Sequence, residues 1–312
     1  MNTVLLSFAL IIALGVGWRR FAADAAAVEA LRSRINATVF NLFLPALCIK
    51  VLSTTGLDRA MFVIPLVALI SLAITLAFAA SVYRLLQRPL GLAPRETGAL
   101  IIAATFGNVT YLGLPVLSER FGPGAAGYAI FFDLFASTPM LWLAGVALAA
   151  HYGSGAPFRL DAALRTLLGL PPLWGCAVGV LLSVGHVTLP ASITHALGLL
   201  AGLVVPLMIF SIGLALQMPK IDRLKAIWPA LLIKMALVPL LTYAVARLCG
   251  LSGPPLAAVA LEGAMPTMVL ALLIARQFKL DEGLTALCIA VSTALSFATL
   301  PLADRLLSVG LG

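Results

Sequence analysis

Residues 106–115 read FGNVTYLGLP, and they interrupt the apolar run GALIIAATFGNVTYLGLPVL at 98–117. Two glycines weaken a helix here, and Pro115 removes one backbone hydrogen bond, so we expect residues 107–115 to be partly unwound. Unpaired backbone groups are costly in lipid, so such a break must face protein or a polar cavity. The half-helix after the break would direct its partially positive N-terminus into that cavity, where it favours an anion.

The composition limits the class of protein. Of 312 residues, 62% are hydrophobic and only 10% are charged, and the mean hydropathy is +1.10. A soluble domain carries about 25% charged residues, so this chain has too few polar side chains to cover a water-exposed surface. The formal net charge of +8 resides mostly in short loops between apolar runs, which indicates membrane topology rather than a nucleic-acid partner. We therefore expect an all-α integral membrane protein whose surroundings are the lipid bilayer.

A spanning helix needs about 20 apolar residues, and ten candidate runs reach roughly that length. Proline, glycine and short charged loops separate them. The candidate spans are 3–19, 35–53, 60–83, 96–118, 125–150, 167–184, 192–217, 227–249, 254–276 and 284–307.

The basic residues divide unequally between alternate loops. One set of loops carries 14 lysines and arginines and the other set carries five, while Lys234 lies within a span. Loops on the cytoplasmic side carry the excess of basic residues, so the first set is predicted to be cytoplasmic. Both termini are then expected outside the cytoplasm, in a multi-pass protein of the inner (plasma) membrane.

The two halves of the chain resemble each other. A shift of 156 residues places Gly107 on Gly263 and Arg120 on Arg276. Each half holds five predicted spans, and an odd number means that the second half inserts upside down relative to the first. We therefore predict a five-helix repeat at 1–150, a cytoplasmic linker at 151–166 and an inverted repeat at 167–312. Inverted repeats are typical of secondary transporters.

The ninth span contains a second interruption. Residues 258–272 read AVALEGAMPTMVLAL, with Gly263 and Pro266 at the depth that matches the first break. Paired broken helices in two halves indicate the central site of a transporter. The alternative is a pair of kinked helices in which Asn108 merely bonds to a neighbouring helix. Asn108-Val109-Thr110 also fits the glycosylation triplet, but its depth within a span argues against that use.

These motifs resemble those of the auxin efflux carrier family, which includes plant auxin carriers and bacterial permeases for malonate and other small carboxylates. The resemblance extends over nearly the whole chain. The residues that carry it are GNVTYLGLPV at 107–116, ERFG at 119–122, PLMIFSIGLAL at 206–216, EGAMPTMVLALLIARQF at 262–278 and VSTALSFATLP at 291–301. It implies ten helices in two inverted five-helix repeats, with spans four and nine crossing at their breaks as in sodium/proton antiporters and bile-acid symporters.

The resemblance also implies a substrate site at the crossing. Asn108 would bind a substrate carboxylate, and Pro115 and Pro266 would shape its surroundings. The full set of expected substrate-binding residues is Gly107, Asn108, Tyr111, Pro115, Gly263, Met265, Pro266 and Thr267. Plant carriers have a proline where this chain has Gly107, and they have a long loop where this chain has a short linker. We therefore expect a small organic acid rather than auxin.

Several other polar residues lie within predicted spans, where ionisable groups indicate function by default. Asp133 and Glu262 are candidates for proton or cation coupling, although Asp133 could instead pair with a basic residue. Lys234 could balance Asp133 or attract an anion, but we favour a side chain that extends to the cytoplasmic interface. The hydroxyls of Ser292, Ser296 and Thr299 share one helical face and either line the crossing or pack between helices. Asn41, Pro45 and Pro206 are predicted to form a scaffold wall beside the crossing.

The sequence thus predicts a secondary transporter of small mono- or dicarboxylates that works by alternating access. Spans three to five and eight to ten would carry the substrate, and the other four spans would form a scaffold and a candidate homodimer interface. Sodium-coupled symport of the bile-acid type and ligand sensing without transport are the alternatives. Scattered cysteines and histidines and the lack of a catalytic motif predict neither an enzyme nor a metal or cofactor site.

Overall fold

The computed structural model describes residues 2–310, apart from residues 23, 56, 154–157 and 217–222. The described residues form helices, with one isolated antiparallel bridge between Gly107 and Thr267 in place of any strand. The helices of the first half are α1 Asn2–Phe21, α2 Ala25–Thr38, α3 Leu44–Thr55, α4 Arg59–Leu86, α5 Pro94–Thr105, α6 Leu114–Phe121, α7 Ala126–Phe132, α8 Thr138–Met140 and α9 Val146–Tyr152. Those of the second half are α10 Leu160–Leu168, α11 Pro171–Val184, α12 Ala191–Gly202, α13 Val204–Ala215, α14 Leu224–Leu232, α15 Val238–Leu248, α16 Gly253–Gly263, α17 Leu270–Gln277 and α18 Glu282–Gly310.

Six stretches of the described helices are long and apolar enough to cross a membrane. They are Ala25–Thr54, Arg59–Leu86, Pro123–Tyr152, Ala191–Ala215, Leu224–Leu248 and Glu282–Ser308. The pair α10 and α11, bent by 52°, would make a seventh. Each of the ten predicted spans coincides with one helix or with helices in series, while α10 begins inside the predicted linker. The protein is therefore a multi-pass membrane protein.

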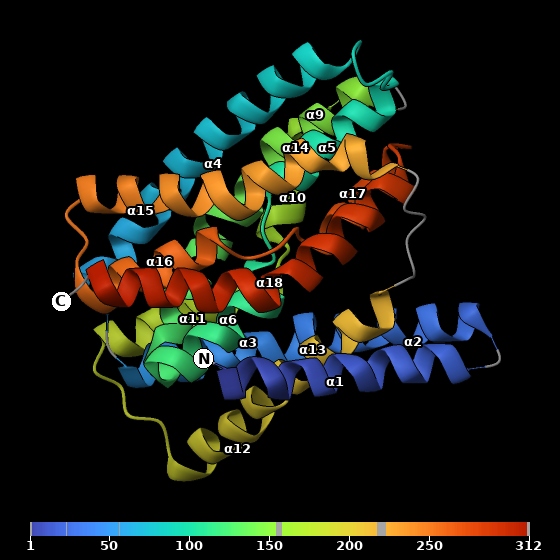
Figure 1. Cartoon of the computed structure of the whole chain (residues 1–312). Coiled ribbons are helices and arrows are strands. Elements are labelled where there is room, and N and C mark those ends of the chain that lie inside the picture. The colour runs from blue at the N-terminus through green and yellow to red at the C-terminus, as the bar shows by residue number, and fades with distance from the viewer. Residues whose placement is uncertain (1, 23, 56, 154–157, 217–222, 311–312) are drawn as a thin grey trace.

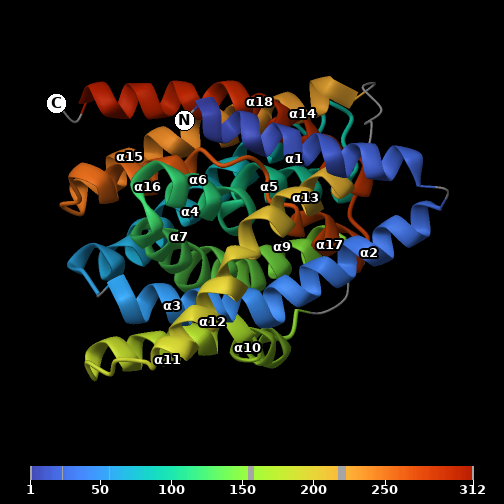
Figure 2. The same cartoon turned by 90° about the horizontal axis from the view of Figure 1, so that it is seen from below.

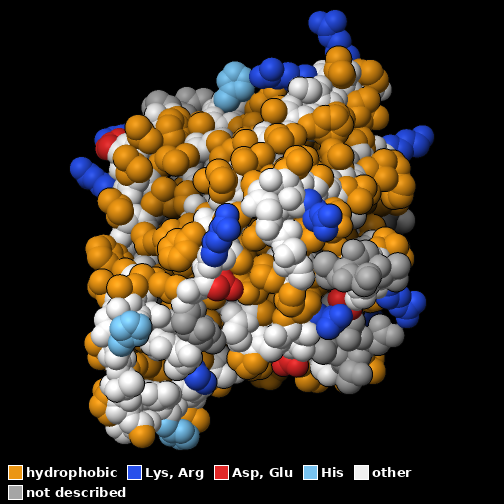
Figure 3. Space-filling view, turned by 90° about the vertical axis from the view of Figure 1, so that its left-hand side faces the viewer, with side chains coloured by type: hydrophobic (Ala, Val, Ile, Leu, Met, Phe, Trp, Pro, Cys, Tyr) orange, Lys and Arg blue, Asp and Glu red, His pale blue; other side chains and the backbone are white. Residues whose placement is uncertain are grey.

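The surface of the protein is apolar, as contact with lipid requires. Hydrophobic side chains occupy much of the face shown in Figure 3. Large apolar side chains are exposed on many helices, for example Leu14, Leu181 and Leu240, which are 67%, 71% and 68% exposed. In water these side chains would form aggregation-prone patches, whereas acyl chains cover them at no cost.

The helices sort by their packing into two groups, which Figure 1 shows one above the other. In the lower group α1, α2, α3, α11, α12 and α13 pack on one another. In the upper group α4, α5 and α14 to α18 do the same, and α7 and α9 pack with them. The groups meet where α13 contacts residues Val109–Gly113, where α3 contacts α7 and where α1 contacts α6. These are the two groups that the sequence assigns to the scaffold and to the substrate-carrying unit.

Prolines explain several irregular turns in the helices. Five π-helical turns are described: η1 Val39–Phe43, η2 Val109–Gly113, η4 Asp133–Ser137, η5 Leu141–Gly145 and η7 Ile233–Leu237. Four of them end two residues before a proline, namely Pro45, Pro115, Pro139 and Pro239. A proline ring clashes with the carbonyl one turn earlier, and a wider turn relieves that clash. The proline alone is not sufficient, because α4, α14 and α18 contain prolines without such a turn.

Glycines bring α1 and α13 into direct backbone contact within the lower group. A Cβ on Gly15 would lie 2.5 Å from the carbonyl oxygen of Phe210, and one on Gly213 would clash with the carbonyl of Ile12. Small residues allow this close approach, which is how membrane helices gain packing energy.

The variant Gly213→Ala is therefore expected to separate these helices and to cost about 1–3 kcal/mol, as overpacking does elsewhere. Thermal unfolding in detergent should show a fall in Tm of several degrees. Gly202→Ala in α12 is the matched control, because a Cβ there meets no atom within 4 Å. An equal Tm for both variants would contradict the close packing.

Candidate functional site

The two breaks meet and complete each other's backbone hydrogen bonds. The Asn108 N–H donates to the Pro266 carbonyl at 2.7 Å, and the Met268 N–H donates to the Phe106 carbonyl at 2.9 Å. Non-helical backbone is tolerated at membrane depth only when protein or a polar cavity pairs it. This short antiparallel pairing satisfies the backbone groups that the interruption at residues 106–108 would leave free. The expected crossing of the two broken helices is therefore present.

The first break is shorter than the sequence suggests. Only residues 106–108 leave the helix, whereas residues 109–113 form the π-helical turn η2 and residues 114–121 form α6. The expected partial unwinding of residues 107–115 is confirmed at residues 107–108 and does not extend to Pro115, which sits in the first turn of α6, where a missing N–H is tolerated. In the second break, residues 264–269 leave the helix before α17 begins.

Thr267 anchors the second break to two helices, α18 and α5. Its N–H donates to the Ser292 hydroxyl at 3.0 Å, and its own hydroxyl donates to the Ala103 carbonyl at 2.9 Å. Ser292 thus lies at the crossing, while the Ser296 hydroxyl donates to the Thr293 carbonyl within α18. The Thr299 hydroxyl is buried without a described partner.

Asn108 lies at the centre of the crossing with a free amide. Its side chain is 1% exposed, and neither its nitrogen nor its oxygen has a described hydrogen-bond partner. It precedes η2 but makes no capping bond to it. A buried amide without partners is costly, and native proteins keep one where a ligand or water completes it. Of the other predicted binding residues, Tyr111 is half-buried and Gly107, Pro115, Gly263, Met265 and Pro266 are buried.

Lys234 is placed differently from the expectation. The predicted extension to the cytoplasmic interface is wrong, because Lys234 is 1% exposed and its ammonium donates to the Gly263 carbonyl at 3.1 Å. A Cβ on Gly107 would lie 2.9 Å from the Lys234 Nζ, so the two residues are in contact. Gly107, which has no side chain, therefore leaves room for a buried cation beside the first break.

Asp133 is held by hydroxyl groups instead of a cation. The hydroxyls of Thr110 and Thr138 both donate to its carboxylate, the second at 3.0 Å. The ion pairs among the described residues do not include Asp133, so the alternative of a basic partner is wrong. Thr110 belongs to η2, and Asp133 therefore ties the half-helix that follows Asn108 to the fifth span.

Glu262 differs from Asp133 in having no described partner. It is 1% exposed on the last turn of α16, and both carboxylate oxygens are buried and unpaired. It lies against Gly113 of η2, where any side chain on the glycine would clash with the carboxylate. The sequence marks Gly113 only as a helix breaker and gives no signal for this contact with Glu262.

The buried polar residues share a local signal that the sequence contains. Thr110, Asp133 and Lys234 each lie on a π-helical turn, five or six residues before Pro115, Pro139 and Pro239 respectively. A π turn widens the helix and is frequent at functional sites. This spacing of five or six residues between a polar side chain and a proline is the sequence signal that would have identified Lys234 as a site residue.

The predicted scaffold wall has a different composition. Asn41 and Pro206 have exposed side chains, and Pro45 packs against Gly175 of α11. The scaffold helix α13 packs against η2, and Met208 and Ile209 of α13 are buried in the same apolar cluster as Leu112 of η2.

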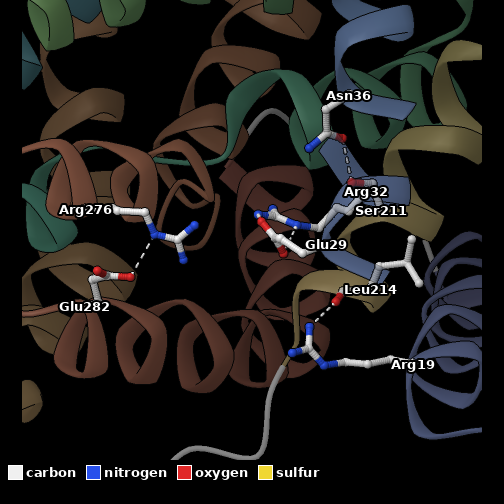
Figure 4. Close-up of polar contacts among 8 residues, drawn as sticks. All are labelled: Arg19, Glu29, Arg32, Asn36, Ser211, Leu214, Arg276 and Glu282. Carbon is white, nitrogen blue, oxygen red and sulfur yellow. Dashed lines mark hydrogen bonds and ion pairs between the residues drawn. The ribbon is translucent and has the colours of Figure 1, made fainter. Parts of the chain in front are cut away.

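Polar contacts gather where the two helix groups face each other at one end of the molecule (Figure 4). Arg32 pairs with Glu29 on α2, and Arg276 of α17 pairs with Glu282 and directs its guanidinium towards them. In the same region the Arg19 guanidinium donates to the Leu214 carbonyl at 2.6 Å, and the Ser211 hydroxyl donates to the Asn36 amide oxygen at 2.5 Å. Three arginines and two glutamates therefore line the boundary between the groups here.

A cavity of about 580 Å³ opens on the apolar surface between α14, α15 and α18. Its lining is almost entirely apolar, and it includes Ala260, two residues before Glu262, and the unpaired hydroxyl of Thr299. The cavity faces the surface that lipid covers, so it suits an acyl chain and not a carboxylate.

Comparison with known proteins identifies the family. The family described as "membrane transport protein" matches residues 6–152 and 158–303. The chain belongs to this family. It is the auxin efflux carrier family that the motifs of spans four and nine resemble, and the match covers both halves of the chain.

Two curated relatives of the family are similar over much of their length. An uncharacterized transporter of Methanothermobacter thermautotrophicus is 29% identical over 276 residues, which cover 86% of this chain and 87% of the relative. An uncharacterized transporter of Methanocaldococcus jannaschii is 27% identical over 212 residues, covering 66% of this chain and 67% of the relative. The protein is therefore a membrane transporter, and transporters are not in general enzymes.

Proposed function

We propose that the protein is a secondary transporter of small organic anions, with mono- or dicarboxylates as substrates. The observation that carries the proposal is the unpaired, buried amide of Asn108 at the crossing of two broken helices, where the Lys234 ammonium lies against the preceding residue, Gly107. A carboxylate accepts hydrogen bonds from an amide N–H₂ and from an ammonium, and such charge-assisted hydrogen bonds are stronger than those between neutral groups.

The site suits a small anion for steric reasons. Gly107, Gly113 and Gly263 all lie against other groups, so the crossing leaves little room beyond a carboxylate and a short chain. The polar side chains are buried in this conformation, and a substrate reaches them only when the two helix groups move apart. The boundary with the arginines of Figure 4 is the place where we expect one side to open.

The proposed transport cycle is alternating access. The scaffold of α1 to α3 and α11 to α13 stays fixed, and the other group rocks against it around the crossing. We propose ten spans in two inverted repeats, because α1, the two broken helices and α11 supply the spans beyond the six that are clear by length. Helix α1 begins and α18 ends toward the left of Figures 1 and 2, and the basic loops between spans support a cytoplasmic side opposite to them.

The variant Asn108→Ala tests the proposed site. Removal of hydrogen bonds to a charged partner costs about 1.5–3 kcal/mol, so uptake should fall roughly 10- to 100-fold. Purified protein in proteoliposomes would be given a panel of radiolabelled acetate, lactate, malonate and succinate. Gln277→Ala is the control, because this amide is exposed at the end of α17.

A second variant separates binding from folding. Asn108→Asp keeps the size of the side chain but places a carboxyl group beside the substrate carboxylate, so it should abolish uptake, while size-exclusion chromatography in detergent checks that the variant still folds. Equal uptake by wild type and Asn108→Ala would remove Asn108 from the site. Saturable binding of a carboxylate by wild type without any uptake would indicate a sensor instead of a transporter.

A further inference from the structure

Glu262 is a buried acid whose surroundings do not hold it in one charge state by hydrogen bonds. Both carboxylate oxygens lie inside the protein without a described donor, although the side chain is only 1% exposed. A charged carboxylate at this depth ordinarily collects donors, as Asp133 does with two threonine hydroxyls. The absence of donors around Glu262 therefore points to a group that changes its charge.

The charged groups near Glu262 are few. Lys234 on η7 faces it and bonds to the next carbonyl along α16, and Asp133 on η4 faces it from the fifth span. Asp304, the other buried acid among the described residues, is paired with Arg120 at 2.8 Å. The remaining charged groups on elements packed against α16 lie toward their ends, namely Arg59, Arg84, Glu119, Arg247, Glu282 and Arg305. The titratable tyrosines on the adjacent η2, α7 and α15 are Tyr111, Tyr128 and Tyr243.

The charges at the crossing give a simple balance. With Asp133 and Glu262 ionised and Lys234 protonated, the empty site carries one net negative charge. A bound carboxylate would add a second negative charge to a low-dielectric interior, which is costly. A proton on Glu262 returns the total to one negative charge. Binding of the substrate therefore favours binding of the proton.

The contact between Glu262 and Gly113 links this charge balance to the position of η2. Glu262 on α16 lies directly against η2, the half-helix that follows Asn108. A carboxylate bound at Asn108 would act on η2 from one end, and the Glu262 carboxyl contacts the same turn at the other end. Any shift of η2 on substrate binding therefore changes the space around Glu262.

We propose that Glu262 is the proton-carrying residue of the transporter, and that one proton moves with each substrate carboxylate in the same direction. The proposal rests on the function proposed above. On the entry side the Glu262 carboxylate takes a proton from water while Asn108 and Lys234 take the anion. On the other side the proton returns to water as the anion leaves, so no other reactant is required. Asp133 stays bonded to its two threonines throughout.

The test uses purified full-length protein in proteoliposomes with radiolabelled malonate or lactate as the probe. With equal substrate on both sides, an inward proton gradient of one pH unit should drive roughly tenfold accumulation of a monocarboxylate by wild type. A sodium gradient without a proton gradient should drive none. Glu262→Gln should lose the gradient-driven accumulation, to a ratio of about one, but keep exchange of labelled for unlabelled substrate. Asp133→Asn should still respond to the proton gradient.

An infrared measurement provides a readout that does not require transport. The carbonyl stretch of a protonated carboxylic acid should appear when substrate is added to the detergent-solubilised wild type, should be missing in Glu262→Gln and should persist in Asp133→Asn. Gradient-driven accumulation by Glu262→Gln equal to wild type would overturn the inference, as would accumulation driven by sodium alone. A wild type that exchanges no probe would overturn the proposed function, and this inference with it.

Discussion

Lys234→Met is expected to reduce carboxylate uptake by about 10- to 100-fold, because it removes the buried cation that lies against Gly107 at the crossing. Charge-assisted hydrogen bonds contribute about 1.5–3 kcal/mol, and no other described cation lies buried at the crossing to replace the ammonium. The measurement is initial uptake of a radiolabelled monocarboxylate by proteoliposomes, as a function of substrate concentration. Lys225→Met on α14 is the control, since that lysine is exposed nine residues earlier in the same span.

A double variant distinguishes two roles for Lys234. If the lysine only balances Glu262, then Lys234→Met combined with Glu262→Gln should recover substrate exchange. If the lysine holds the substrate carboxylate, the double variant should remain as inactive as Lys234→Met. The coupling of two close residues is measured in this way without assigning a separate energy to each. Wild-type exchange by the single variant would exclude Lys234 from the site.

Gly113→Ala is expected to produce the other large effect. The new methyl group would clash with the Glu262 carboxylate, so either η2 or the carboxylate must shift. Overpacking of this kind costs about 1–3 kcal/mol, and here it separates α16 from the half-helix that carries the site. We expect uptake to fall by roughly tenfold or more, with only a modest loss of thermal stability.

The control and the rescue are both available in this chain. Gly17→Ala in α1 should transport as wild type does, because a Cβ there meets no atom within 4 Å. Glu262→Asp in the Gly113→Ala background shortens the acid by one methylene and should restore part of the uptake. Uptake by Gly113→Ala at the wild-type rate would show that the contact between η2 and Glu262 does not matter for transport.

The positions of the helices and of the breaks could be predicted from local features of the chain. Apolar runs of about 20 residues cross the bilayer because backbone groups must be paired within the helix there. Gly107 and Pro266 mark the two breaks because glycine and proline weaken the same pairing. The matched breaks of the two halves predicted a central site. The resemblance to the auxin efflux carriers implied that Asn108 lies at the crossing.

The partners of the buried charges could not be predicted in the same way. Lys234 has a chain long enough to reach an interface, and only packing against Gly107 and the Gly263 carbonyl keeps it inside. A basic partner is one alternative that the sequence leaves open for Asp133, but its partners in the structure are Thr110 on η2 and Thr138 in its own span. The partners of a buried charge can lie many residues away in the chain or on the next turn of the same helix. The composition of the sequence does not show which groups they are.

The sequence by itself determined that this protein lives in a membrane, that its helices break twice and that the breaks correspond. Those properties depend on the hydrophobic effect and on backbone hydrogen bonds, which act over a few neighbouring residues. Only the tertiary structure decided that Lys234 bonds to the Gly263 carbonyl beside Gly107, that Asp133 is satisfied and that Glu262 is left against Gly113. The reason is that the charge state and the role of a buried side chain depend on which donors reach it, and close packing of distant helices decides that.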